Sequence, residues 1–443
     1  MTGMLGPGIS LQTTGGARVE YDDFIGSGGQ GEVYSVTVDG EPKALKWYYP
    51  QSATEERRNI VDELIHNPAT DARFLWPEAL VVGRGVLGFG YVMRLRPKSY
   101  SGLPELFSRQ VDAKPRQLTT AGLLLVEAFQ TLHRDGIAYR DISWGNVFFE
   151  PVTGEVLICD NDNAVFDGRS TEIAGTMEFM APELVRGDAG ARPSVQTDLH
   201  SLAVLLFMIL VNHHPMLGRR ELAIHCLDER AQKRLYGTRP LFIFDPVDQS
   251  NRADERAHET AIAMWEFIPG ALRELFVKAF TVGLHDPGAR VREGEWIDTL
   301  GLCRDSIISC RHCSKQNMTE PEVGLARLGA CWKCRNRLDS LGTLTFRAAG
   351  NAPHRILLDR ESRVFAHHLG EDLGRHDFQR ARAEVREHPQ RPGRYGLTNL
   401  TERPWSATTR DGRHHEVLPE RSVALSDGLT IIMGGYRATV ALG

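Results

Sequence analysis

The sequence lacks any hydrophobic run long enough to cross a membrane. Its longest apolar stretch, residues 202–211, has about half the length that a transmembrane helix needs, so it predicts a buried core helix. The chain also opens without a basic and then apolar signal segment. Because residues 1–16 are rich in Gly and Thr, we expect residues 1–17 to form a flexible N-terminal tail. No membrane partner is expected.

An excess of positive charge is also missing. The formal net charge is −5 at pH 7, with 52 Lys and Arg against 57 Asp and Glu. This balance gives no electrostatic reason to expect nucleic acid or acidic lipid as a partner. At 443 residues, with 42% of them hydrophobic, the chain is too long for one compact core and predicts about three domains.

Cysteine is scarce and unevenly distributed. Cys159 and Cys226 are isolated, whereas the other five of the seven cysteines lie between Cys303 and Cys334. This clustering favours metal binding in a reducing compartment over a disulfide framework. We therefore expect a cytoplasmic protein.

A polar loop in residues 139–146 carries the strongest chemical signal. It offers Asp141 and then Asn146, and a short apolar run ends at Asp160. The first carboxylate can accept a hydroxyl proton, while the amide and the second carboxylate can hold Mg²⁺ against phosphate oxygens. The alternative is a polar turn between two strands, because Asp and Asn are ordinary turn residues.

A glycine-rich segment, Gly26-Ser27-Gly28-Gly29-Gln30-Gly31, lies between strand-like residues 19–25 and 32–38. A dinucleotide fingerprint opens a helix, whereas this segment opens a strand. It predicts a hairpin flap whose backbone amides can approach phosphates. The alternative is a flexible hairpin tip.

Lys46 lies among apolar residues on a third expected strand, residues 43–48. A lysine that points inward needs an anion, either a phosphate or a carboxylate. Residues 54–67 have helical periodicity and place Glu63 beside the apolar stripe, with Glu56 as a second candidate. Two further strands are expected in residues 77–93, and a helix over residues 121–133.

These motifs, taken in order, resemble the signature set of eukaryotic-type protein kinases over roughly the first 300 residues. The series comprises Gly26, Gly28 and Gly31, then Lys46, Glu63, Tyr139-Arg140-Asp141, Asn146, Asp160 and Ala181-Pro182-Glu183. Arg290 resembles the arginine that pairs with the Ala-Pro-Glu glutamate in that family. The resemblance implies an α+β bilobal kinase domain over residues 18–302.

The resemblance also implies ATP and Mg²⁺ as cofactors, with Mn²⁺ as an alternative metal. Lys46, held by Glu63, would orient the α- and β-phosphates, Asn146 and Asp160 would carry the metal, and Asp141 would accept the substrate proton. The implied nucleotide-binding residues are Gly26, Gly28, Gly31, Val33, Ala44, Lys46, Met93, Asn146 and Asp160.

Three departures from the family pattern affect rate and regulation. Ser143 occupies the position of a lysine that contacts the γ-phosphate in Ser/Thr kinases. Asn161-Asp162 replaces Phe-Gly after Asp160, which adds a carboxylate that could serve as an auxiliary metal ligand or favour Mn²⁺. Tyr139 replaces a histidine, which is a milder change.

The substrate class follows from Thr176, which resembles the threonine that braces the catalytic aspartate in Ser/Thr kinases. Arg140 could receive a phosphate on Ser170, Thr171 or Thr176, and the alternative is that it pairs with a local carboxylate. Thr176 therefore favours Ser or Thr over Tyr as the acceptor in a protein substrate.

Two smaller modules are expected after the kinase domain. Residues 240–279 look like an aromatic-containing insert that packs on the helical lobe. Residues 303–341 then resemble a zinc ribbon, since two Cys-x-x-Cys knuckles can hold a closed structural Zn²⁺. The expected ligands are Cys310, Cys313, Cys331 and Cys334, with Cys303 and His312 as substitutes.

Residues 342–443 predict an all-β sandwich, with strands at residues 354–358, 394–400, 405–409, 422–425, 429–433 and 436–442. Its last strands resemble forkhead-associated domains, which read phosphothreonine. Arg360 and residues 379–382 occupy the places of that family's phosphate-contacting motifs without matching them. A docking or autoregulatory sandwich is the preferred interpretation.

The three-part order resembles bacterial kinases of tellurite-resistance-type stress systems, which implies a von Willebrand-type protein and a metal-dependent phosphatase as partners. The leading hypothesis is an ATP- and Mg²⁺-dependent Ser/Thr protein kinase. A nucleotide-binding pseudokinase scaffold is the alternative, motivated by Ser143 and Asn161. A small-molecule phosphotransferase is disfavoured, because Ala181-Pro182-Glu183 belongs to a platform for protein substrates.

Overall fold

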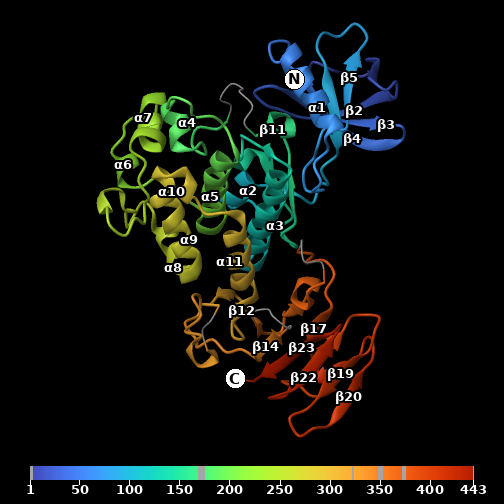
Figure 1. The fold of residues 1–443 in the computed structure, drawn as a ribbon, viewed down its shortest axis with the longest axis vertical. Helices are drawn as coiled ribbons and strands as arrows, with labels where there is room; N and C mark the ends of the chain where they lie inside the picture. Colours follow the sequence, from blue (N-terminus) through green and yellow to red (C-terminus); the bar gives the residue numbers. More distant parts are fainter. Residues whose placement is uncertain (1–2, 168–174, 322–323, 348–352, 372–375, 443) are drawn as a thin grey trace.

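The computed structural model has three parts arranged along its long axis (Figure 1). A small β-rich lobe lies at the upper right beside the top of a larger helical lobe, and a second β-rich region, coloured orange to red, lies below. The structure describes residues 3–167, 175–321, 324–347, 353–371 and 376–442. Among the helices in these ranges, none combines the length and the apolar character needed to cross a bilayer.

The upper lobe is a closed barrel with strand order β1-β2-β3-β4-β6-β5. Apolar side chains alternate along its strands and fill the interior, with Tyr34, Leu45 and Trp47 fully buried. The strands are β1 (Leu11–Thr13), β2 (Arg18–Ser27), β3 (Gly31–Val38), β4 (Glu41–Tyr48), β5 (Ala79–Gly83) and β6 (Gly90–Arg94).

The expected flexible tail is wrong for the described part of residues 1–17. Leu11 pairs with Val19 of β2 and with Gly83 of β5, so strand β1 closes the barrel. Leu5 and Leu11 are 3% and 2% exposed. The Gly- and Thr-rich composition concealed these two apolar anchors, whose burial favours an ordered segment.

Helix α1 (Glu55–His66) contacts both lobes: its buried Val61 lies in an apolar cluster with barrel residues, and its buried Leu64 belongs to the core cluster of the helical lobe. The Thr54 side chain caps its N-terminus by accepting a hydrogen bond from the backbone N–H of Arg57 at 3.1 Å. This helix corresponds to the one expected over residues 54–67, and its first turn faces the segment that follows Asp160.

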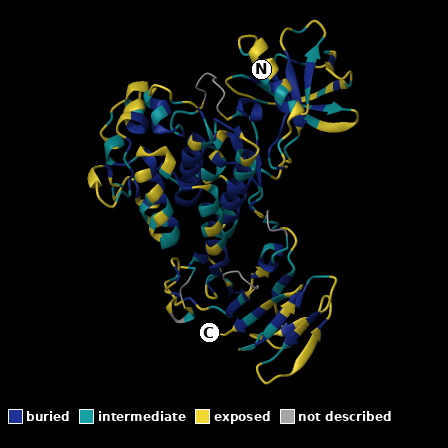
Figure 2. Cartoon of the chain, viewed as in Figure 1, coloured by how far each residue is buried: buried dark blue, intermediate teal, exposed yellow. Residues whose placement is uncertain are grey.

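The helical lobe is built around α5 (Val195–Val211), whose residues from Thr197 to Val211 are all buried (Figure 2). This confirms the interpretation of residues 202–211 as a core helix. The other helices of this lobe are α2 (Leu103–Phe107), α3 (Pro115–Arg134), α4 (Pro182–Arg186), α6 (Arg219–Leu222), α7 (Glu229–Lys233), α8 (Glu259–Phe267), α9 (Gly270–Phe280), α10 (Val282–His285) and α11 (Glu293–Asp305).

Short strands support the loops that face the upper lobe. They are β7 (Ser101–Gly102), β8 (Ile137–Ala138), β9 (Val147–Phe149), β10 (Val156–Ile158) and β11 (Val165–Phe166). The segment that we expected to be an insert packs on this lobe as predicted. Phe242 contacts Phe207 of α5 with ring centroids 5.6 Å apart, and Phe244 stacks on Trp265 of α8 at 4.5 Å.

The lower region is a sandwich of two antiparallel sheets, as expected from the turn-bounded strands. One sheet has the order β15-β14-β23-β22-β19-β20 and the other β16-β17-β18-β21, and both contribute to one apolar core. The strands are β14 (Gly342–Arg347), β15 (His354–Leu358), β16 (Arg363–Val364), β17 (Ala383–Glu387), β18 (Tyr395–Asn399), β19 (Trp405–Thr408), β20 (His414–Val417), β21 (Ser422–Ala424), β22 (Thr430–Met433) and β23 (Tyr436–Ala441).

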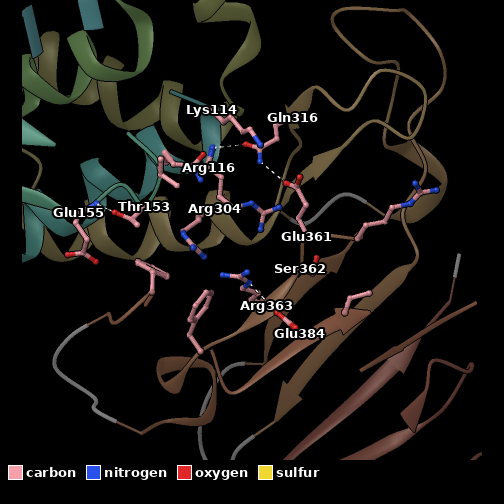
Figure 3. Close-up of a pocket in the computed structure, with 16 residues that line it drawn as sticks. Lys114, Arg116, Thr153, Glu155, Arg304, Gln316, Glu361, Ser362, Arg363 and Glu384 are labelled. Atoms are coloured by element: carbon pink, nitrogen blue, oxygen red, sulfur yellow. Dashed lines mark hydrogen bonds and ion pairs between the residues drawn. The ribbon is translucent and has the colours of Figure 1, made fainter. Parts of the chain in front are cut away.

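A small hairpin, β12 (Ile307–Ser309) with β13 (Gln316–Met318), joins the helical lobe to the sandwich. Gln316 accepts a hydrogen bond from the backbone N–H of Arg116 in α3 at 3.0 Å. Its amide donates to Glu361, in the loop before β16, at 3.1 Å. Gln316 therefore connects three parts of the chain, beside a cavity of about 490 Å³ (Figure 3).

The C-terminal end of α11 makes a second connection to the sandwich. Asp305 Oδ2 lies 2.7 Å from His354 Nε2 and 3.0 Å from His368 Nε2. The neighbouring Arg304 guanidinium stacks over the Phe378 ring at 3.6 Å from the ring centroid. The helical lobe and the sandwich are thus joined by buried polar contacts as well as by chain connectivity.

Candidate active site

The polar loop of residues 139–146 is held from below by one buried carboxylate. Asp198 of α5 is 1% exposed and accepts the backbone N–H groups of Tyr139 at 2.6 Å and Arg140 at 3.0 Å. His133 at the end of α3 contacts the same carboxylate at 3.2 Å. The loop therefore has a fixed backbone, even though it carries little regular structure.

Asp141 is oriented by two neighbours. Asn146 donates from Nδ2 to the Asp141 carbonyl at 2.9 Å and to its Oδ2 at 3.1 Å. Thr176 donates to Asp141 Oδ1 from its backbone N–H at 3.1 Å and from its hydroxyl at 3.2 Å. The brace expected of Thr176 is present, and Asn146 keeps its side-chain oxygen for another partner.

Asp160 follows β10 and has a left-handed backbone, with φ of 59°. The residue before it, Cys159, donates its backbone N–H to the Asn146 carbonyl at 2.9 Å. This bond joins the Asp160 segment to the loop of Asp141 and Asn146. Asp160 Oδ1 lies 2.7 Å from Lys46 Nζ of β4, so the contact crosses from one lobe to the other.

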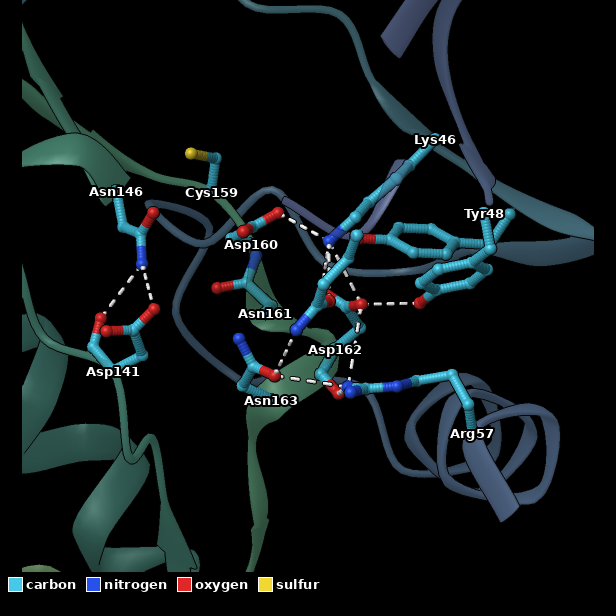
Figure 4. Close-up of polar contacts among 12 residues, drawn as sticks. Lys46, Tyr48, Arg57, Asp141, Asn146, Cys159, Asp160, Asn161, Asp162 and Asn163 are labelled. Carbon is cyan, nitrogen blue, oxygen red and sulfur yellow. Dashed lines mark hydrogen bonds and ion pairs between the residues drawn. The ribbon is translucent and has the colours of Figure 1, made fainter. Parts of the chain in front are cut away.

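Lys46 has two carboxylate partners, and neither is on helix α1 (Figure 4). Its Nζ lies 2.7 Å from Asp160 and 2.9 Å from Asp162, and its side chain is 5% exposed. Burial alone lowers the pKa of Lys46, but the charges of Asp162 and Asp160 outweigh it and raise that pKa above its ordinary value.

The expected pairing of Lys46 with Glu63 is therefore not found. Glu63 is half-buried on α1, and the fallback candidate Glu56 is exposed. The helix instead presents Arg57, whose Nη1 donates to the Asp162 carbonyl at 3.2 Å and to Asn163 Oδ1 at 3.1 Å. Position within a helical stripe could not show which carboxylate lies nearest to the lysine.

Asp162 is fully buried, in η2 (Asn161–Asn163), and its carboxylate points toward β4 and β6. It accepts hydrogen bonds from the Tyr48 hydroxyl and, at 3.3 Å, from the Tyr91 hydroxyl. Burial opposes ionisation, but Lys46, Tyr48 and Arg57 together lower the pKa of Asp162. These contacts occupy the side chain that the sequence left open as an auxiliary metal ligand.

The glycine segment differs in steric freedom from one position to the next. A Cβ on Gly31 would lie 2.3 Å from the Trp47 carbonyl oxygen, so the close pairing of β3 and β4 requires glycine there. At Gly26 and Gly28 a Cβ would meet no atom within 4 Å. Open space beside these backbone amides is suited to a ligand such as a phosphate chain.

The remaining expected nucleotide contacts lie on adjacent strands. Val33 is opposite Lys46 in the β3–β4 pairing, and Ala44 is opposite Met93 in the β4–β6 pairing. Ala44 and Met93 belong to the same apolar cluster as Leu157 of β10 in the other lobe. Apolar side chains from both lobes thus meet beside Lys46.

Two further motif expectations concern the segment that leads to α4. Arg290 donates from Nη2 to Glu183 Oε2 at 2.7 Å, which is the expected pairing. Arg140 donates from Nε to the Asn163 carbonyl. Ser170 and Thr171, expected as acceptors of a regulatory phosphate, lie outside the described residues.

A second chemical site lies in the segment around β12 and β13. The Sγ atoms of Cys310, Cys313, Cys331 and Cys334 all lie within 4.8 Å of one another. Cys310 and Cys334 are 3.6 Å apart, as are Cys313 and Cys331. Four thiols gathered in this way fit a tetrahedral Zn²⁺ with thiolate ligands. The proposed substitutes do not join them: Cys303 is buried in the core of the helical lobe, and His312 is exposed.

Sequence reasoning missed the contributions of Arg57, Tyr48 and Tyr91. None of them carries a local signal, because their importance depends on the position of Asp162. The role of Asp198 was also missed: its carboxylate supports the polar loop of residues 139–146.

Comparison with known proteins shows the family to which the chain belongs. A family model described as "Protein kinase domain" matches residues 19–269, which is more than half of the chain. "Probable serine/threonine-protein kinase mkcF" of Dictyostelium discoideum is 26% identical over 202 residues, 45% of this chain and 28% of that kinase. "Serine/threonine-protein kinase PknK" of Mycobacterium bovis is 29% identical over 195 residues, 43% of this chain and 17% of that kinase.

"Serine/threonine-protein kinase AtPK2/AtPK19" of Arabidopsis thaliana is 34% identical over 99 residues, 22% of this chain and 20% of that kinase. The chain thus spans at most 28% of the length of these three relatives. This chain belongs to the protein kinase domain family.

Proposed function

We propose that the protein transfers the γ-phosphate of ATP to Ser or Thr of a protein substrate, with Mg²⁺ as the metal and Mn²⁺ as a possible substitute. The observation that carries the proposal is the connected set Lys46–Asp160–Asn146–Asp141. It joins the two lobes through the 2.7 Å Lys46–Asp160 contact and the hydrogen bonds from Asn146 to Asp141.

Each residue of this set has a role that its position suits. Asn146 Oδ1 and the Asp160 carboxylate would hold the metal, which neutralises phosphate charge when bound. Asp141, held by Thr176 and Asn146, would accept the proton of the substrate hydroxyl. Lys46 would bind the α- and β-phosphates, and the open backbone at Gly26 and Gly28 would cover the phosphate chain.

The choice of Ser/Thr over Tyr rests on Thr176, whose hydroxyl donates to Asp141 at 3.2 Å. The names of the three relatives agree with this choice. The Arg290–Glu183 pair supports a stable platform for a protein substrate after the catalytic loop.

The test is phosphate transfer from labelled ATP to a generic basic protein, with Mg²⁺ and with Mn²⁺. Because positioning and charge neutralisation supply most of the rate, we expect Asp160→Asn and Lys46→Met to lower transfer by about 100-fold or more. Unchanged circular dichroism and thermal unfolding would show that the fold is retained. Full activity of either variant would contradict the assignment.

A nucleotide-binding scaffold is the second candidate, favoured by Ser143 at the position where a lysine is expected. Nucleotide binding by the wild-type protein, without transfer in either metal, would support it. In that case the four-cysteine segment and the sandwich would be the working parts and would dock partners.

The accessory parts carry three finer proposals. We assign Zn²⁺ to Cys310, Cys313, Cys331 and Cys334 in a structural role, because four protein ligands leave no open position. We assign docking or autoregulation to the forkhead-associated-like sandwich. The resemblance to bacterial stress kinases suggests cytoplasmic partners, namely a von Willebrand-type protein and a metal-dependent phosphatase.

A further inference from the structure

We propose that Asp162, and not a carboxylate of helix α1, is the positioning residue for Lys46. The inference rests on the proposed kinase function and assigns a role within that site to a residue outside the motif series. It also changes which element controls the lysine, since Asp162 lies in the segment that carries Asp160.

The contact between the two residues is close and has two parts. Lys46 Nζ lies 2.9 Å from Asp162 Oδ1 and 3.0 Å from Oδ2, so the ammonium group faces both oxygens. The side chains are 5% and 0% exposed. A buried ammonium group needs a buried counter-charge, and Asp162 provides one that solvent does not reach.

Asp162 is itself held in place by the barrel. Tyr48, two residues after Lys46, points to the same face of β4, and its hydroxyl donates to Asp162. The Tyr91 hydroxyl approaches from the neighbouring strand β6 at 3.3 Å. Burial raises the pKa of both tyrosines, so both keep the proton with which they hydrogen-bond the carboxylate.

Helix α1 contacts this site through a positively charged side chain, whereas a carboxylate was expected. The helix offers the Arg57 guanidinium to the Asp162 carbonyl and to Asn163 Oδ1, while Glu63 makes no ion pair with Lys46. Gln30 of the glycine segment also contacts Asn163 Oδ1, at 3.4 Å. Helix, glycine segment and lysine therefore all converge on Asn161–Asn163.

The two carboxylates that contact Lys46 have different roles. Asp160 is 37% exposed and can turn toward a metal, whereas Asp162 is enclosed and stays with the lysine. When Asp160 engages the metal, Lys46 still has a partner that fixes its direction. Asp162 thereby acts on the phosphates only through Lys46.

The experiment compares Asp162→Asn with Glu63→Gln in the full chain, and Asp62→Asn, an exposed carboxylate on α1, is the matched control. Because a displaced lysine loses its alignment with the phosphates, we expect Asp162→Asn to lower kcat/KM for ATP by about 100-fold. Glu63→Gln should lower it by less than about threefold, since its carboxylate does not contact the lysine. A large loss in Glu63→Gln with near-wild-type Asp162→Asn would overturn the proposal.

A double-variant cycle separates positioning from general stability. In the Lys46→Met background, Asp162→Asn should lower affinity for a fluorescent ATP analogue by less than about twofold, whereas a purely structural role would give additive losses. If Asp162→Asn does not fold, Tyr48→Phe, which keeps both charges and removes one hydroxyl, should lower affinity by about three- to tenfold. Wild-type affinity in that variant would count against the proposal.

Failure of the kinase assignment gives a different result. If wild-type protein transfers no phosphate, the proposed function fails, but the affinity measurements still report on Lys46. Equal losses of affinity in Asp162→Asn and Lys46→Met would then retain the positioning role. Wild-type affinity in Asp162→Asn would remove it.

Discussion

At the scale of single residues, one imidazole supports the polar loop of residues 139–146 from below. His133 lies between Asp198 and Glu293 with its side chain 5% exposed. Burial lowers the pKa of His133, but hydrogen bonds and charge from the two carboxylates prevail and raise it to about 9. His133 therefore stays protonated up to a higher pH in the folded protein than in the unfolded chain.

This pKa sets a pH dependence of stability. A histidine with a raised pKa contributes stability that is fully present below about pH 6.5 and is lost as the pH rises toward 9. We expect the free energy of unfolding of the wild-type protein to fall across this window more steeply than that of His133→Gln. The difference in slope is at most about 1.4 kcal/mol per pH unit.

Denaturant unfolding at a series of pH values measures this slope. His66→Gln removes an exposed histidine of α1 that also pairs with an aspartate, and it serves as the control. Parallel pH profiles for the wild-type protein and His133→Gln would show that His133 is not charged in the fold.

The sequence predicted contacts between motif residues but did not predict the partner of Lys46. Chain order was enough to predict that Thr176 braces Asp141 and that Arg290 pairs with Glu183, because each depends on a motif with a fixed neighbour. The partner of Lys46 depends on the distance between segments more than 100 residues apart in sequence. Helical periodicity placed Glu63 on the correct helix but could not compare it with Asp162.

At the scale of secondary-structure elements, the barrel depends on its first strand. Strand β1 hydrogen-bonds to both β2 and β5, so it completes a sheet that would otherwise have two open edges. We expect Leu11→Ala to lower the free energy of unfolding of the barrel by about 2–4 kcal/mol, because its side chain is buried in a packed core.

Thermal or denaturant unfolding checks this expectation, with Leu87→Ala as the control because Leu87 is 83% exposed. A flexible tail would give no difference between the two variants. Equal unfolding midpoints for Leu11→Ala and Leu87→Ala would therefore indicate that residues 1–17 form a flexible tail.

Other elements show why strand prediction was incomplete in the sandwich. Strands β15, β18, β19, β21, β22 and β23 lie between clear turns, and they were expected. Strand β17 carries three charged residues in Ala383–Glu387, and β20 is mostly exposed, so neither has a strong apolar pattern. Their pairing with β18 and β19 defines them, and pairing is a tertiary property.

At the scale of the whole molecule, the four-cysteine segment lies between the kinase lobe and the sandwich. Ile308, Cys310, Cys331 and Leu357 of β15 share one small apolar cluster. A cluster of this size has too little apolar area to hold the segment without a metal. Zinc is therefore expected to order the connection rather than the nucleotide site.

We expect the purified protein to contain about one Zn²⁺ per chain and Cys313→Ser to lose most of it, because the closed site needs all four thiolates. Limited proteolysis should then cut within residues 306–340, while nucleotide affinity stays within about twofold of wild type. Cys226→Ser, which changes an exposed and isolated cysteine, is the control. Unaltered zinc content in Cys313→Ser would contradict the assignment.

Helix α11 connects the sandwich to the polar loop of residues 139–146 through contacts at its two ends. Its first residue, Glu293, contacts His133, which in turn contacts the carboxylate beneath Tyr139 and Arg140. Its last residue, Asp305, contacts His354 and His368. The helix is a stiff rod of about 20 Å. A partner that binds the sandwich and changes its orientation would therefore displace α11. Through His133 and Asp198, that displacement would reach the polar loop of residues 139–146, although the partner would bind far from the nucleotide.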